Sequence, residues 1–160
     1  ILTRGVSAAL AASVGLERVM PLVETGPQIG HGRVGNLPTG VSLGEFAKSL
    51  ARALPSTATG VRVAGDFEYQ VQRVALCGGA GSFLITTALR AGAQAFVTAD
   101  LKYHDFFKAA DKLVLADIGH FESEQFTIDL LQERLAEKFP TFAVLKTSVS
   151  TNPVNYLWHK

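Results

Sequence analysis

A histidine and a glutamate four residues apart, His120 and Glu124, are the side chains in this sequence best suited to chemistry. They lie where an apolar strand is expected to lead into a helix, and on a helix this spacing directs both side chains to one face. A neutral imidazole nitrogen and a carboxylate oxygen are common ligands of divalent transition metals, so the pair indicates a metal site. A solvated helix start, with acidic residues near the positive end of the helix dipole, explains the same pattern without a ligand.

Two other acidic residues stand close to this pair. Asp117 precedes it and is expected to orient the imidazole of His120 by accepting its second N–H, as carboxylates behind metal-binding histidines do. Glu122 lies two residues after His120, so its side chain should point to another face of the helix and be exposed to solvent.

A glycine-rich turn is the second candidate for ligand binding. Gly78, Gly79 and Gly81 would let the backbone approach a ligand closely, and Ser82 begins a helix whose N–H groups could bind an anion such as phosphate. The turn lacks the Gly-Lys-Ser/Thr of a P-loop, and a simple tight turn between strand and helix is the alternative. The preceding Cys77 is expected to be a small buried residue, not a nucleophile.

A third loop places Asp100, Lys102 and His104 within five residues. Together they could bind phosphate or relay a proton. His104 is the candidate general acid or base because the reference pKa of histidine lies near neutrality. In the alternative interpretation Asp100 is a turn residue and His104 caps a helix. Another histidine, His31, has no partner at metal-ligand spacing and is expected to be structural or exposed.

The elements that position these loops follow from hydrophobic periodicity. The N-terminal part of the sequence predicts a helix at 6–16, capped by Ser7, and two strands at 18–24 and 28–37. A second helix is predicted at 42–54, where it begins with the capping box Ser42-Leu43-Gly44-Glu45. From Val61 onward apolar strands alternate with helices, with strands at 71–77, 95–98, 113–116 and 142–146 and helices at 82–90, 104–110 and 121–139. Such alternation predicts an α/β fold with a mainly parallel sheet flanked by helices, whose carboxyl edge gathers the three loops.

Composition narrows the class of protein. The chain has 160 residues, enough for one domain, and 15 Lys+Arg against 14 Asp+Glu give a net charge of +1. This balance argues against a nucleic-acid partner and favours a small-molecule ligand. With 48% hydrophobic and only 18% charged residues, the surface is expected to pack against a partner. The single cysteine fits a reducing compartment, by default the cytoplasm, and no apolar run reaches the roughly 18 residues of a membrane span.

Five segments, taken in order, resemble one known family: the GTP cyclohydrolase I type 2 homologues, also called YbgI-like or NIF-three-like proteins. The matching segments are Gly32-Arg33-Val34-Gly35-Asn36-Leu37-Pro38, Val74-Ala75-Leu76-Cys77-Gly78-Gly79-Ala80-Gly81-Ser82, Thr98-Ala99-Asp100-Leu101-Lys102-Tyr103-His104, Ile118-Gly119-His120-Phe121-Glu122-Ser123-Glu124 and Thr151-Asn152-Pro153-Val154-Asn155-Tyr156. Their order and spacing make the resemblance more specific than any single glycine loop.

The resemblance implies a three-layer α/β fold, two divalent metal ions in each subunit, and a homohexamer built as a trimer of dimers. The metal ligands of such proteins are an adjacent His-His pair and an Asp from the N-terminal half, and a His and a Glu from the C-terminal half. Only the last two map onto this sequence, as His120 and Glu124. Residues 1–160 therefore look like the C-terminal part of the domain, without its upstream metal-binding half. Two side chains cannot hold two metal ions, so this part alone is expected to be inactive.

The function implied by the resemblance is hydrolytic opening of the imidazole ring of GTP with release of formate. His120 and Glu124 would hold metal, His104 would relay protons, and Lys102 or the turn from Gly78 to Ser82 would meet the triphosphate. Zinc, iron, manganese and nickel all suit these ligands. The alternative is a non-catalytic oligomeric protein that carries metal or docks a partner.

Overall fold

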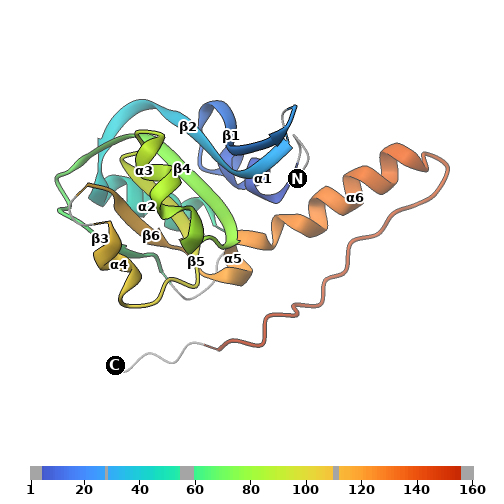
Figure 1. Cartoon of the computed structure of the whole chain (residues 1–160). Coiled ribbons are helices and arrows are strands. Elements are labelled where there is room, and N and C mark those ends of the chain that lie inside the picture. Colours follow the sequence, from blue (N-terminus) through green and yellow to red (C-terminus); the bar gives the residue numbers. More distant parts are fainter. Residues whose placement is uncertain (1–4, 28, 55–59, 110–111, 156–160) are drawn as a thin grey trace.

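A six-stranded mixed sheet forms the centre of the molecule (Figure 1). The computed structural model describes residues 5–27, 29–54, 60–109 and 112–155. In spatial order the strands are β1 (Glu17–Gly26), β2 (Ile29–Ser42), β4 (Gln70–Ala80), β5 (Ala95–Ala99), β6 (Val114–Asp117) and β3 (Arg62–Ala64). Strands β4, β5 and β6 run parallel to one another, whereas β1, β2 and β3 each pair antiparallel with their neighbours. The expected parallel core is therefore confirmed, and β3, which follows Val61, is an antiparallel edge strand.

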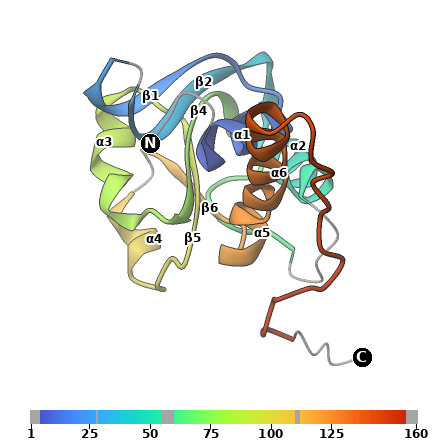
Figure 2. The ribbon, with the colours of Figure 1, turned by 90° about the vertical axis from the view of Figure 1, so that its right-hand side faces the viewer.

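Helices cover both faces of this sheet. They are α1 (Val6–Ser13), α2 (Leu43–Ala53), the short 3-10 helix η1 (Ser82–Leu84), α3 (Ile85–Arg90), α4 (Asp105–Lys108), α5 (His120–Glu124) and α6 (Phe126–Lys138). Figure 2 shows α3 and α4 on one side of the strands and α1, α2 and α6 on the other. The sheet therefore lies between two helical layers, as the sequence predicted.

Two apolar cores result, one on each face of the sheet. Leu10 of α1 and Phe46 of α2 pack in one core, and Ile85 of α3 packs with Phe96 of β5 in the other. Every residue of β5 and β6 is buried, which explains why their sequences are almost continuously apolar. The central strands are thus fixed from both sides, and their carboxyl ends have defined positions.

Of the two helix caps that the sequence predicts, the structure confirms one and contradicts the other. Ser42 caps α2 by accepting a hydrogen bond from the Glu45 N–H at 3.3 Å. Helix α1 instead begins after Gly5, and Ser7 lies within its first turn, where its hydroxyl accepts a bond from the Gly78 N–H at 3.2 Å. The predicted Ser7 cap was therefore wrong, because this hydroxyl joins α1 to the end of β4.

The C-terminal part differs most from expectation. The predicted long helix is divided at Gln125 into α5 and α6, which extend in different directions (Figure 1). The strand predicted at 142–146 is absent, and Leu145 is 90% exposed. Strand β3 already occupies the edge beside β6, so the segment runs back along α6, where Gln132 Nε2 donates to the Val144 carbonyl at 2.9 Å. None of the helices in the described ranges is long and apolar enough to cross a membrane.

Candidate metal centre

The three loops predicted to converge do so at the carboxyl edge of β4, β5 and β6. Thr98, near the end of β5, donates its hydroxyl to the Gly79 carbonyl of β4 at 2.9 Å. The Ile118 N–H, just after β6, donates to the Thr98 carbonyl at 3.0 Å. These bonds hold the glycine turn, the loop that begins at Asp100 and the start of α5 together.

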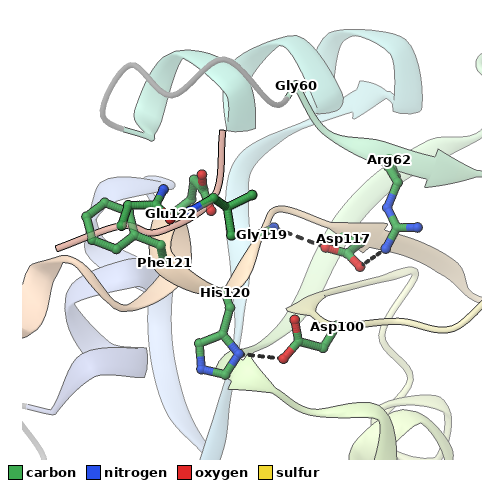
Figure 3. A pocket seen from close by; sticks show the side chains of 10 residues that line it. Gly60, Arg62, Asp100, Asp117, Gly119, His120, Phe121 and Glu122 are labelled. Atoms are coloured by element: carbon green, nitrogen blue, oxygen red, sulfur yellow. Dashed lines mark hydrogen bonds and ion pairs between the residues drawn. The ribbon is translucent and has the colours of Figure 1, made fainter. Parts of the chain in front are cut away.

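His120 stands between the carboxyl groups of Asp100 and Glu124 at this edge. Figure 3 shows its bond to Asp100. Its Nδ1 lies 2.5 Å from Asp100 Oδ2, and its Nε2 lies 3.3 Å from Glu124 Oε2. With Nδ1–H donating to Asp100, the lone pair of Nε2 faces the Glu124 side. The predicted pairing of His120 with Glu124 on one face of a helix is therefore seen, and the imidazole is oriented for a ligand at Nε2.

Electrostatics at this pair favour the protonated imidazole. The hydrogen bond to the Asp100 carboxylate raises the pKa of His120 above its usual 6.5, against a smaller opposing effect of burial, and Glu124 adds to the rise. Roughly half of the side chain of each of the three residues remains exposed. Binding of a cation at Nε2 would therefore compete with a proton, and the site is open to solvent.

Gly79 makes room for this arrangement. Its φ is +68°, and a Cβ at this position would lie 2.4 Å from Glu124 Oε1 and 3.4 Å from His120 Nε2. Its N–H donates to Ser123 Oγ at 2.8 Å, so this amide is not available to an anion. The glycine turn thus allows α5 to approach β4 closely, and the space beside both candidate ligands stays open because residue 79 has no side chain.

The residues present fit a divalent ion in part. Nε2 of His120 and the carboxylate of Glu124 are accessible donors of suitable chemistry next to that space. Across the described ranges, no group of three or more His, Cys, Asp or Glu side chains is arranged to hold an ion. This part of the chain therefore supplies two donors, and an ion here would need further ligands.

Asp117 does not have its predicted role. One of its carboxyl oxygens accepts the Leu101 N–H at 2.9 Å and pairs with Arg62, and the other accepts the Gly119 N–H at 3.0 Å. Asp117 is buried at the end of β6, where these backbone N–H groups and the guanidinium use both of its oxygens. Asp100, from the neighbouring loop, orients His120 instead.

Glu122 is also placed differently from the prediction. Its side chain is 1% exposed, not solvated, and turns toward Gly119, where a Cβ would lie 2.2 Å from Glu122 Oε2. Helix α5 contacts the sheet and α1, so a residue on a second face of this short helix is also buried. Among the described residues, no group hydrogen-bonds to Glu122 Oε1.

A cavity of about 290 Å³ opens beside these residues (Figure 3). The residues that line it include Asp100, His120, Glu122, Arg62 and Asn152. Sequence reasoning did not select Arg62, because no motif surrounds it on the edge strand β3. Asn152 belongs to the C-terminal segment that carried the family resemblance, which was its only signal.

The other predicted site residues lie away from this cavity. Lys102 and His104 are exposed and do not line it, and the ring of His104 packs edge-on against Tyr103 with 5.5 Å between ring centroids. His104 immediately precedes α4, in agreement with the capping alternative, but its side chain forms no cap hydrogen bond. His31 is exposed, as expected. Cys77 is buried, and burial raises the pKa of its thiol, in agreement with a structural residue.

The glycine-turn prediction has a mixed result. Gly78, Gly79, Gly81 and Ser82 lie at the same sheet edge as His120 but do not line the cavity. A Cβ at Gly81 would lie 2.5 Å from Thr98 Oγ1, so this glycine is needed for packing. Contact of these residues with a phosphate remains a prediction.

Comparison with known proteins agrees with the resemblance. The family model for Duf34/NIF3 (NGG1p interacting factor 3) matches residues 1–153. A GTP cyclohydrolase 1 type 2 homolog of Mycobacterium leprae is 39% identical over 140 residues, which cover 86% of this chain and 36% of the relative. Another, from Nostoc sp., is 34% identical over 132 residues, which cover 82% of this chain and 50% of the relative. The chain therefore spans only about a third to a half of these curated relatives.

Solved structures give the same assignment. A Bacillus cereus protein related to NIF3 superposes with a TM-score of 0.73 at 30% identity, covering 80% of this chain and 36% of that one. A Staphylococcus aureus hypothetical protein superposes with a TM-score of 0.84 at 23% identity, covering 96% of this chain and 64% of that one, which shows the shared fold. From the family model, the curated relatives and these structures, the chain belongs to the Duf34/NIF3 family.

Proposed function

We propose that His120 and Glu124 bind a divalent metal ion in an intact protein that hydrolyses the imidazole ring of GTP and releases formate. The observation that carries the proposal is the line of contacts from Asp100 through the imidazole to Glu124, at 2.5 and 3.3 Å. The curated relatives named GTP cyclohydrolase 1 type 2 homologs support this choice of substrate.

The contacts of the described residues indicate a separate role for each of them. Asp100 holds the Nδ1–H of His120 and keeps the imidazole turned with Nε2 outward, while Gly79 leaves the space that a ligand needs. A divalent ion, when bound, polarises the carbon under attack and lowers the pKa of water. His104 remains our candidate for proton relay, and Lys102 or the Gly78–Ser82 turn for phosphate contact.

The chain by itself should be inactive. Its described residues offer two side-chain donors at the site, whereas divalent transition metals take about four to six ligands. We propose that the intact protein holds two such ions per subunit, with the missing ligands supplied by residues beyond 1–160. Zinc, iron, manganese and nickel are all compatible with His and Glu.

Formate release tests the proposal. The intact protein, loaded with metal, should release formate from GTP, and His120→Ala should abolish the release because the ion loses a ligand. His31→Ala is a matched control, since this exposed histidine lies on β2 and does not line the cavity. Equal release by the wild type and His120→Ala would refute the assignment.

The surface of α6 favours a second candidate function, that of a non-catalytic oligomeric protein that carries metal or docks a partner. None of its residues is buried, and large apolar side chains on the helix and the segment after it are exposed, namely Ile128, Leu131, Leu135, Phe139, Phe142 and Leu145. Such a surface suits self-association, and we propose a cytoplasmic homohexamer. Turnover that disappears with a chelator and returns with added metal would favour the enzyme. Metal binding without turnover of any nucleotide would favour the carrier.

A further inference from the structure

Glu122 is a buried acceptor whose hydrogen-bonding capacity is not used. The side chain is 1% exposed, and within the described ranges Oε1 has no hydrogen-bond partner. A buried polar atom without a partner costs free energy, so proteins rarely retain one without a reason. The residue also lines the cavity beside His120.

The other carboxyl groups of this cavity already have partners. Asp117 accepts bonds from two backbone N–H groups and pairs with Arg62, and Asp100 is bonded to His120. Among the described residues that line the cavity, Glu122 is therefore the one whose carboxyl group has a buried oxygen without a hydrogen-bond partner. What this oxygen requires from a ligand is a hydrogen-bond donor.

The opposite side of the cavity carries the complementary group. Arg62 uses only Nη2, which bonds to the Leu101 carbonyl at 3.0 Å and pairs with Asp117. Within the described part of the chain its Nε and Nη1 make no hydrogen bonds, and 61% of the side chain is exposed. Phe121, labelled in Figure 3, and Val154 also line the cavity and add apolar surface to its walls. The cavity thus combines an acceptor for N–H donors, apolar walls for a flat ring and a cation for an anionic group.

We propose that Glu122 determines nucleobase specificity by accepting hydrogen bonds from the N1–H and the exocyclic amine of a guanine, with Arg62 as a phosphate contact in addition to Lys102 or the Gly78–Ser82 turn. This assignment rests on the proposed function, from which it takes GTP as the ligand. It adds the residue that distinguishes guanine from other bases. A carboxylate matches two adjacent donors, which guanine presents and adenine does not. Inosine lacks the exocyclic amine and would satisfy only one of the two bonds.

A ligand can reach Glu122 if one wall of the cavity moves. Asn152 and Val154 form part of that wall. Among the described residues, the hydrogen bonds of segment 147–155 are all internal, such as the one from the Val154 N–H to Asn152 Oδ1 at 3.1 Å. This segment can therefore shift without breaking a hydrogen bond to the domain.

The test compares binding of GTP, ITP and ATP to the intact protein by equilibrium dialysis. The wild type should prefer GTP over ITP and over ATP by at least about tenfold, because a site built for a donor rejects analogues that lack it. Glu122→Gln keeps the shape of the side chain but places an amide N–H against a donor. It should lose at least about tenfold in GTP affinity, while ITP and ATP change much less. Glu68→Gln, an exposed residue that does not line the cavity, is the matched control.

The outcomes separate this inference from the proposed hydrolysis. Equal affinity of the wild type for GTP and ITP, or unchanged GTP preference in a folded Glu122→Gln protein, would overturn the role of Glu122 even if formate is released. Loss of guanine preference in Glu122→Gln would support the role even if GTP is bound without being hydrolysed. Circular dichroism of the variant confirms folding, and the ITP comparison in the wild type does not depend on the variant.

Discussion

At the scale of residues, three side chains from two loops have different roles in the site. Asp100 orients, His120 presents Nε2, and Glu124 faces it from one helical turn further along. Sequence spacing identified the last two but assigned orientation to Asp117, which bonds to backbone N–H groups and Arg62 instead. Spacing works within one helix, whereas the contact between Asp100 and His120 joins residues 20 positions apart.

Replacing Asp100 by Asn should lower the pKa of His120 toward 6.5, because the acceptor oxygen remains but its charge is lost. A folded-state pKa above the unfolded value stabilises the protein fully below about pH 6.5, and this contribution is lost as the pH rises through the raised pKa. The variant should therefore lose more stability at pH 6 than at pH 9, by less than about 1 kcal/mol since the pair is half exposed.

NMR titration of the His120 ring protons measures this pKa directly. Asp66→Asn is the control, because Asp66 lies in a turn where its carboxyl group accepts the Glu68 N–H at 3.0 Å, an acceptor role that asparagine keeps. An unchanged pKa of His120 in Asp100→Asn would show that Asp100 does not hold the imidazole in solution.

Gly79→Ala and Gly92→Ala form a second matched pair. Both glycines have positive φ, +68° and +70°, so either alanine should cost about 1 to 2 kcal/mol of stability. Only at Gly79 would the new Cβ meet Glu124 Oε1, whereas nothing lies within 4 Å at Gly92. Metal affinity of the intact protein should therefore fall in Gly79→Ala alone, as isothermal titration calorimetry can show. Equal affinities in the two variants would mean that Glu124 is not a ligand.

At the scale of elements, the sequence predicted what local periodicity controls. The parallel strands β4, β5 and β6, the helices between them and the meeting of their loops were all expected, because buried strands and crossover helices have distinct patterns. The break at Gln125 and the missing strand at 142–146 were not. The missing strand depends on which sheet edges are occupied, because β3 already pairs with β6, and an apolar alternating segment carries no information about that.

The Ser42 cap of α2 gives an element-scale prediction. Ser42→Ala removes the acceptor for the Glu45 N–H and should lower the free energy of unfolding by about 1 kcal/mol, measured by urea denaturation. Ser42→Asp supplies another acceptor and should restore most of the loss. If Ala and Asp destabilise equally, the hydroxyl does not cap this helix in solution.

At the scale of the whole molecule, the chain combines a well-packed domain with an extended C-terminal arm. Figure 1 shows α6 and the segment after it projecting from the sheet, and none of the residues of α6 is buried. The high apolar and low charged content of the sequence predicts surface that packs against a partner, and this arm is our candidate for that surface. The proposed metal site would also be incomplete in this chain, because the two candidate ligands among the described residues would need others to complete it.

Metal content of the purified intact protein tests the central claim most directly. We expect divalent metal to co-purify with the wild type and with the control His31→Ala, and to be lost from His120→Ala and from Glu124→Gln. Residues 1–160 alone should hold little or none. Metal retained at the wild-type level by both ligand variants would contradict the assignment of His120 and Glu124 as metal ligands.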